Sequence, residues 1–327
     1  LRAVRSSIVF QHMDIVLNGN VGFNLETDDT ATTGSRCILQ NSTIAFLDLN
    51  IKHTGSGGEI RKLFHLENTW FSRSNFIVKQ VKGTFDVQNE AIPVHLLTTE
   101  WYHQSSVQMD HLDLEFSDAR FAVRGTRHED GEFMDSSFTV SNSNFHIQSA
   151  SASEYYDAFY FIGVSARRSH FSILNHSHIC EGHSCTYIFF EHHLYDSSVT
   201  VSRADMRLSG QNYGQYGFLH TPSLTWERST VTFEHINVAT SGANGFYFYD
   251  LRSPQPAQVE NHVRFHNVHV TTSVSSNDLF FFRGDVDSFV MTDSSYDFDG
   301  VTCAFTGHHS APNTHGMGFL LFGNGIG

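Results

Sequence analysis

Acidic side chains gather in two short stretches of the sequence, and these are the first places to look for acid–base chemistry. Asp110, Asp113, Glu115 and Asp118 form one stretch, and residues 293–299 hold three more aspartates. A glycoside hydrolase needs two carboxyl groups within about 10 Å of each other, in acid and base or nucleophile roles. A lyase needs calcium-binding carboxylates and a basic side chain. We interpret both stretches as solvated strand exteriors, because no second carboxylate cluster accompanies them in the neighbouring repeats described below.

Other catalytic motifs are missing from the sequence. It contains no glycine-rich phosphate loop in a strand-to-helix context, no GxSxG and no HExxH. The GHH at 307–309 lacks the paired-aspartate motifs that accompany a Gly-His in polygalacturonases. We therefore predict no catalytic residue, no cofactor and no metal site, and we lean towards a protein that is not an enzyme.

Two of the four cysteines lie close together in the phrase ICEGHSC. Cys180 and Cys185 are candidates for a disulfide that closes a small loop, which would fit an oxidising compartment. The alternative is a zinc site that adds His176, His178 and His183 to the two thiolates. The spacing of these residues matches no familiar zinc finger, so the disulfide is the preferred interpretation.

Two sequons offer candidate glycosylation sites. They are Asn41-Ser-Thr and Asn175-His-Ser. A chain so rich in serine, threonine and asparagine contains such triplets by chance. The sequons are therefore compatible with an extracellular glycoprotein without showing one.

The elements that must position these residues appear as an internal repeat. The phrase SSFTVSNSNFHI at residue 136 returns as SSIVFQHMDIVL at 6, STIAFLDLNI at 42 and SSVTVSRADMRL at 197. Ten copies, mostly 31–33 residues apart, align on an apolar anchor that follows the repeat serine by two residues. Two residues after the anchor runs a predicted core ladder: Phe10, Phe46, Val78, Met109, Val140, Ile173, Val201, Phe233, Phe265 and Met291. Four residues after the anchor runs a polar column: His12, Asp48, Gln80, His111, Asn142, Asn175, Arg203, His235, Asn267 and Asp293.

This repeat predicts an all-β fold, a right-handed parallel β-helix of about ten coils with three short strands per coil. Alternation with a period of two indicates strands, and Asn, Asp and His in the polar column indicate a left-handed corner. Stacked coils superimpose equivalent residues about 4.8 Å apart, so columns of like side chains are expected. Cys37 and Cys303 would then lie about 40 Å apart, too far to form a disulfide. A β-propeller or sandwich is the alternative fold.

Composition limits the setting of the protein. The 327 residues are 40% hydrophobic and 17% charged, with a formal net charge of −14, which argues against nucleic acid as a partner. No apolar run is long enough for a membrane span. We expect one β-helical segment over residues 1–327, part of a longer chain. The 22 histidines also suggest a surface whose charge changes near pH 6.5.

The repeat phrase with its Phe-rich third strand resembles the pectate-lyase-like parallel β-helix superfamily. NSTIAFLDLNI at 41 and RSTVTFEHINV at 228 also resemble the large surface proteins of the trypanosomatid dispersed gene family. That resemblance implies a cell-surface, adhesin-like chain of many such repeats. It transfers no catalytic residue.

We expect a structural or adhesive segment of an extracellular or cell-surface protein, able to assemble into a filament or appendage. Its expected partners are other copies or further repeats of the same chain, and glycans or other surface proteins. The alternative is a carbohydrate-active enzyme or a carbohydrate-binding β-helix. In that case Trp70 and Trp101, each four residues before the repeat serine, would stack against sugars.

Overall fold

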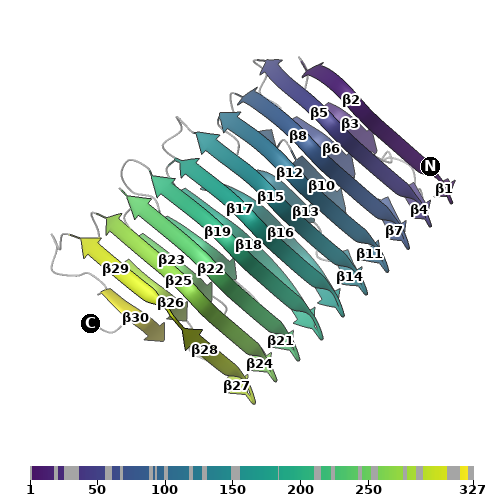
Figure 1. Cartoon of the computed structure of the whole chain (residues 1–327). Helices are drawn as coiled ribbons and strands as arrows, with labels where there is room; N and C mark the ends of the chain where they lie inside the picture. Colours follow the sequence, from purple (N-terminus) through teal and green to yellow (C-terminus); the bar gives the residue numbers. More distant parts are fainter. Residues whose placement is uncertain are drawn as a thin grey trace.

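In the computed structural model, every regular element of the described part of the chain is a β-strand (Figure 1). The described residues are 2–17, 21–25, 37–55, 61–66, 69–87, 91–92, 94–98, 102–117, 121–126, 131–148, 155–182, 184–209, 215–221, 225–241, 245–251, 257–274, 278–284, 290–307 and 317–322. Across these residues we find no helix long and apolar enough to cross a membrane.

The strands form three sheets. The largest contains β1 (Arg2–Val4), β4 (Cys37–Gln40), β7 (Thr69–Ser72), β10 (Val94–Thr98), β11 (Tyr102–His103), β13 (Phe121–Thr126), β14 (Gly131–Met134), β16 (Tyr155–Arg167), β18 (Ser184–Tyr195), β20 (Gln215–Thr221), β21 (Thr225–Glu227), β23 (Gly245–Leu251), β24 (Ala257–Val259), β26 (Asp278–Gly284), β27 (Val290–Thr292) and β30 (Met317–Phe322). The second contains β2 (Ser7–Leu17), β5 (Thr43–Gly55), β8 (Asn75–Val87), β12 (Ser106–Ser117), β15 (Ser137–Gln148), β17 (His170–Glu181), β19 (Ser198–Ser209), β22 (Thr230–Ser241), β25 (His262–Val274), β28 (Ser295–Asp299) and β29 (Thr302–Gly307). The third contains β3 (Val21–Leu25), β6 (Arg61–Leu66) and β9 (Ala91–Ile92).

The second sheet shows the architecture most clearly. Its strands follow the order β2-β5-β8-β12-β15-β17-β19-β22-β25-β28, and each pairs in parallel with the strand one repeat away (Figure 1). A parallel sheet in which every neighbour comes from the next repeat is the signature of a solenoid. The predicted parallel β-helix is therefore confirmed.

The register superimposes the predicted core ladder from Phe10 to Phe265. Phe10 lies beside Phe46 with ring centroids 5.1 Å apart, and Phe46 lies beside Val78. Phe233 and Phe265 stack at 5.1 Å near the other end. From Phe46 to Phe265 every ladder member is buried, which makes this column one wall of the hydrophobic core.

The tenth member of the ladder differs from the prediction. β28 places Phe298, not Met291, beside Phe265, while Met291 lies in β27 beside Gln258. The phrase DSFVMT at 287–292 imitates the repeat, but Ser294 is the residue that follows Asn261 in the serine column. The last repeat is thus shifted by seven residues, and its predicted anchor Phe289 falls outside the described residues.

Each coil turns at single left-handed residues, and this changes the predicted division into three short strands. Asn142 has φ 49° in the middle of β15, so the first two predicted strands form one bent strand of 12 residues. Phe138 and Val140 before the bend and Phe145 and Ile147 after it all face the core. One residue in left-handed conformation redirects the chain without ending its pairing.

Two columns of left-handed residues run along the stack. The His/Asn corner comprises His12, Asp48, Gln80, His111, Asn142, Asn175, Arg203, His235, Asn267 and Gly300. The Arg/Asp corner comprises Arg5, Asn41, Arg73, Gln104, Asp135, Arg168, Asp196, Arg228, Glu260 and Asp293. The polar column predicted from the sequence is the His/Asn corner, except that Gly300 replaces Asp293 in it. The Arg/Asp corner was not predicted.

A hydrogen-bonded serine column follows the Arg/Asp corner through the interior. The backbone N–H of Ser105 donates to Ser136 Oγ at 3.1 Å, and the N–H of Ser136 donates to Ser169 Oγ at 3.1 Å. Each hydroxyl also donates to a carbonyl; Ser136 Oγ donates to Met134 O at 2.8 Å. The same pattern runs from Ser6 to Ser294, with Asn261 taking one serine's place. The left-handed turn leaves the buried N–H of each repeat serine without a partner in the sheet. The hydroxyl of the serine in the next repeat accepts this N–H.

Gly83 replaces the apolar residue that other repeats carry at this place in the bent strand. A Cβ at Gly83 would lie 2.5 Å from the ring of Phe85, which stacks on Phe116 at 5.3 Å. The Phe85 ring thus fills the space that a side chain would take. The core of the third repeat is therefore filled by Phe85, although Gly83 has no side chain.

Replacing one serine of the column will test this explanation. Ser136→Ala leaves the buried N–H of Ser105 without its acceptor, so we expect the free energy of unfolding to fall by about 1–3 kcal/mol. Ser172→Ala, on the half-exposed outer face of β17, is the matched control and should change it by less than about 0.5 kcal/mol. Urea unfolding measures both. Equal effects of the two substitutions would contradict a special role for the column.

Candidate functional site: the two polar corners of the coil

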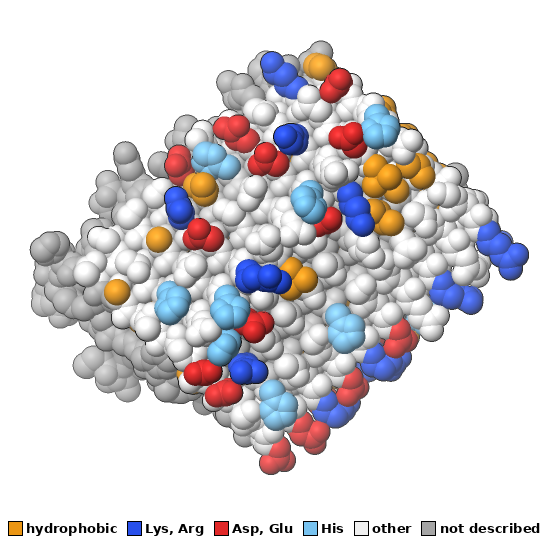
Figure 2. Space-filling view, viewed as in Figure 1, with side chains coloured by type: hydrophobic (Ala, Val, Ile, Leu, Met, Phe, Trp, Pro, Cys, Tyr) orange, Lys and Arg blue, Asp and Glu red, His pale blue; other side chains and the backbone are white. Residues whose placement is uncertain are grey.

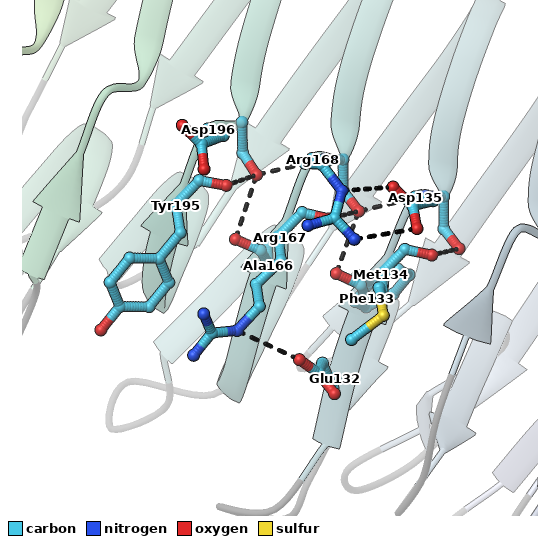
Figure 3. Close-up of polar contacts among 12 residues, drawn as sticks. Glu132, Phe133, Met134, Asp135, Ala166, Arg167, Arg168, Tyr195 and Asp196 are labelled. Atoms are coloured by element: carbon cyan, nitrogen blue, oxygen red, sulfur yellow. Dashed lines mark hydrogen bonds and ion pairs between the residues drawn. The ribbon is translucent and has the colours of Figure 1, made fainter.

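The Arg/Asp corner carries a line of ion pairs between neighbouring coils. Arg168 Nε and Nη2 donate to the two carboxylate oxygens of Asp135 at 2.6 and 3.1 Å (Figure 3). Arg228 binds Asp196 in the same two-pronged way, at 2.6 and 3.2 Å, and also contacts Glu227. The arginine bonds lower the pKa of both aspartates. With pKa values below that of a free aspartate, these two carboxylates stay ionised near neutral pH and orient the corner.

A second charge pair flanks this corner on the outer face of the first sheet. Arg167 Nε lies 3.2 Å from Glu132 Oε1, and its guanidinium lies 4.6 Å from the ring centroid of Tyr195 (Figure 3). Figure 2 shows side chains of both signs along the edge where β1, β4, β7, β11 and β14 lie in Figure 1. Because the signs are mixed, this edge is not a uniform charged surface for a polyanion or a polycation.

The His/Asn corner holds a groove. It has a volume of about 550 Å³ and runs along the first four strands of the second sheet. Its lining residues are His12, Met13, Asp14, Asp48, Leu49, Asn50, Gln80, Lys82 and His111. His12 Nδ1 contacts Asp48 Oδ2 at 2.7 Å, and Asn50 Nδ2 donates to Asp14 Oδ1 at 3.2 Å. The groove thus offers carboxylates, amides, imidazoles and one ammonium group beside the partly exposed side chain of Met13.

Asp110, the first carboxylate singled out in the sequence, is held as a hydrogen-bond acceptor. Burial raises its pKa, but bonds from Ser141 at 2.7 Å and Asn142 at 2.9 Å and the neighbouring His111 outweigh burial, and the net pKa is lowered. A carboxylate that stays ionised in this way is poorly suited to donate a proton. Asp110 therefore serves the corner structure.

Among the described residues, the other acidic candidates have no carboxylate opposite them in the neighbouring strands. Asp113 is exposed and lies between Lys82 and Asn144 in the neighbouring strands, so its vertical neighbours are not acidic, as predicted. Glu115 is exposed, and Asp118 lies outside the described residues. At the other end, Asp297 lies beside Arg264 and Asp299 beside His266.

Cys180 and Cys185 form the disulfide inside the core, with a Cα–Cα separation of 6.3 Å. Both cysteines are fully buried. Their sulfurs are therefore not available as the thiolates of the zinc alternative, and His183 lies outside the described residues. Cys37 and Cys303 are both free, the first buried and the second exposed.

Two histidines beside this disulfide form a buried polar cluster that we did not predict. His176 and His178 face the interior from β17, and His176 Nδ1 lies 2.9 Å from the hydroxyl of buried Tyr187. Burial lowers the pKa of His178 to about 3 and that of His176 well below its usual value, and it raises the pKa of Tyr187. The alternation of β17 places both rings inward, and this was the signal available in the sequence.

The sequon asparagines lie at the two corners. Asn41 is exposed at the Arg/Asp corner with φ 47°. Asn175 is exposed at the His/Asn corner, where its Nδ2 donates to Asn142 Oδ1 at 2.8 Å. A glycan on Asn175 would have to share or replace that bond, whereas Asn41 has no such bond to lose among the described hydrogen bonds.

The tryptophans do not form a described sugar-binding ladder. Trp70 lies beside Ile38 in the first sheet and its indole nitrogen is buried. Trp101 lies outside the described residues. Trp226 is fully buried. The described tryptophans therefore contribute to the wall and the core of the coil.

Comparisons with known proteins add little beyond the fold. No protein-family model and no curated protein matches the chain. Among solved structures, the chain is similar to the A-module of mannuronan C-5 epimerase AlgE6 from Azotobacter vinelandii. The two share 10% sequence identity with a TM-score of 0.30, and the match covers 97% of this chain and 90% of the epimerase module. The A-module of AlgE4 from the same bacterium gives 10% identity and a TM-score of 0.23, over 93% and 90%. Similarity at this level says nothing about what this chain binds or does, and the trypanosomatid family finds no support in these comparisons.

The buried histidines predict an acid-sensitive core. Because His178 has a pKa of about 3 in the folded chain and about 6.5 when unfolded, only the unfolded state binds the proton between these values. The free energy of unfolding therefore keeps its full value above about pH 6.5. Below that pH it falls by about 1.4 kcal/mol per pH unit for each such histidine.

Between pH 7.5 and pH 5, the free energy of unfolding of the His178→Met variant should therefore fall by about 2 kcal/mol less than that of the natural chain. Exposed His170→Met, on the same strand, is the control and should follow the natural chain. Urea unfolding at several pH values measures the difference. Parallel pH profiles for all three proteins would show that the buried imidazole does not cause the acid sensitivity.

Proposed function

We propose that this chain is a non-enzymatic structural or adhesive segment of an extracellular or cell-surface β-helical protein, and that it stacks end to end with copies or further repeats of itself. The observation that carries the proposal is where apolar surface is exposed. The large hydrophobic side chains that are exposed among the described residues are Val4, Val9, Met13, Val16 and Phe298. All of them belong to the first or the last coil.

Some of these side chains are core residues that a further coil would cover. Met13 lies beside Leu49, which is 2% exposed, yet Met13 itself is 38% exposed. Phe298 stacks on Phe265 with centroids 4.8 Å apart and is still 37% exposed. On the face drawn in Figure 2, the largest group of hydrophobic side chains lies at the β2 end of the stack. The interior columns thus reach solvent at both ends.

The backbone at the two ends is also open. Among the described strands, β2 pairs only with β5, and β28 pairs only with β25. An unpaired parallel edge with matching apolar side chains is a template for another strand of the same register. A further coil of this repeat would continue the sheet, the core ladder and the serine column together.

A non-enzymatic role is supported by how the carboxylates are used. Asp110, Asp135 and Asp196 accept structural hydrogen bonds and their pKa values are lowered. An extracellular setting is supported by the buried Cys180–Cys185 disulfide, since disulfides persist mainly in oxidising compartments. Exposed sequons at Asn41 and Asn175 are compatible with a glycoprotein. A cell-surface chain of many repeats is also what the resemblance to the trypanosomatid dispersed gene family implies.

The stacking proposal is tested by placing a charge on an end face. Met13→Lys keeps its ammonium hydrated in a single rod but would bury it unpaired in an end-to-end contact, so we expect it to abolish association. Thr84→Lys adds the same charge to the exposed outer face of β8 in mid-stack and should leave association unchanged. Sedimentation velocity over a range of protein concentrations measures the mass. A natural chain that stays monomeric, or a Met13→Lys variant that assembles like it, would contradict end-to-end stacking.

The groove of the His/Asn corner favours carbohydrate binding as a second candidate function. Carboxylate, amide and ammonium groups beside the partly exposed side chain of Met13 suit the hydroxyls and apolar faces of sugars. If the groove binds an acidic glycan, Lys82→Ala should weaken binding at least tenfold on a glycan array. Lys79→Ala, whose residue is not part of the groove lining, is the control. Binding that is absent, or equally strong in both variants, would remove this candidate.

A further inference from the structure

We propose that the C-terminal part of the His/Asn corner is a binding site for a divalent metal ion of the zinc type, with Glu234, His235 and His266 as ligands. One ligand atom from each of these three side chains lies within 4.8 Å of the others. Carboxylate plus imidazole is a donor set that zinc uses, with a fourth position left for water. The site does not depend on the proposed stacking function.

The stacked register brings these residues together from separate repeats. Glu234 of β22 lies beside His266 of β25, and His266 lies beside Asp299 of β28. His235 follows Glu234 at the left-handed corner with φ 54°, which turns its ring towards His266 at a centroid distance of 5.5 Å. Its Nε2 lies 3.8 Å from Glu234 Oε1. Because His266 lies 31 or 32 residues from the other two ligands in the sequence, spacing alone could not reveal the site.

Asp299 prepares His266 for metal binding. Its Oδ2 lies 2.8 Å from His266 Nδ1, so the carboxylate accepts the Nδ1 proton and leaves the Nε2 lone pair for a ligand. Metal-binding histidines commonly carry such a carboxylate on the second ring nitrogen, which fixes the tautomer and orients the ring. Asp299 thus acts as a positioning residue for the proposed metal.

Asn267 bridges the two imidazole rings. Its Nδ2 lies 3.1 Å from His266 Nε2 and 3.3 Å from His235 Nδ1. An amide nitrogen has two donor hydrogens, so one group satisfies two acceptor nitrogens at once. A cation on His266 Nε2 would replace the contact from Asn267, with the amide turned aside.

The site can contract onto a metal without moving the coil. Ligand atoms about 2.0–2.2 Å from zinc in a tetrahedron lie about 3.4 Å apart, so atoms that are up to 4.8 Å apart here must approach by up to about 1.4 Å. Glu234 is 42% and His235 49% exposed, and both lie on a corner where their χ angles can adjust. The metal would then tie β22 to β25 at the corner.

Zinc binding to the full chain tests the proposal. The chelator-treated protein is titrated with zinc chloride alone by isothermal calorimetry, at fixed pH. We expect His266→Gln and His235→Gln each to lose one binding site or to weaken it at least tenfold. His262→Gln is the matched control, because His262 is an exposed histidine of the same strand that contacts Ser295 outside the cluster.

Asp299→Asn separates a metal site from general histidine affinity. It leaves all three ligands in place but removes the carboxylate that holds His266 Nδ1, and we expect 10–100-fold weaker binding. Zinc should also raise the urea midpoint of the natural chain and not that of His266→Gln. Equal zinc stoichiometry and affinity in the natural chain and in both ligand variants would overturn the proposal, as would an equal loss in His262→Gln.

Discussion

The hydrogen bond from the backbone N–H of one repeat serine to the hydroxyl of the next is the interaction on which this coil depends. A left-handed residue at the Arg/Asp corner turns the chain sharply, and the following N–H leaves the sheet while staying buried. An unpaired buried donor would cost about 1–3 kcal/mol in every coil. The serine hydroxyl accepts this N–H and donates to a carbonyl, so it satisfies two groups with one small side chain. Asn261 shows that the requirement is for an oxygen at this place, since its Oδ1 accepts from Ser229 at 2.8 Å.

Regular turning has consequences for both the core and the surface. Inside, it superimposes apolar residues such as Phe233 and Phe265, so that each coil completes the core of the next. At the corners, it superimposes polar side chains that are far apart in the sequence, which creates ion pairs such as Arg168–Asp135 and clusters such as Glu234–His235–His266. At the ends, the same columns reach solvent. The proposed stacking and the proposed metal site are therefore two results of one geometry.

The sequence predicted what repeats strictly and missed what varies. Alternation around Phe138 and the recurring serine were sufficient for the fold, and Asn142 was sufficient for the His/Asn corner. The Arg/Asp corner was not predicted because arginine and glutamate have no particular preference for left-handed backbone. At these positions the pairing of neighbouring coils holds the residue in the left-handed conformation. The last repeat was misplaced because DSFVMT satisfies the same short pattern as the true strand. His178 lies at an inward position of the alternating pattern, but its contact with the cluster of His176 and Tyr187 appears only in the folded coil.

Distances between spin labels along one outer column test the stacked coil most directly. With Cys37 and Cys303 replaced by serine, labels at Thr84 and Arg207 are four pairing steps apart, and labels at Thr84 and Thr271 are six. At about 4.8 Å per step, the labelled Cα atoms lie roughly 19 and 29 Å apart, so the label-to-label distances from electron spin resonance should differ by about 10 Å. The account predicts this linear increase with the number of coils between the labels. Separations that do not grow with that number would contradict it.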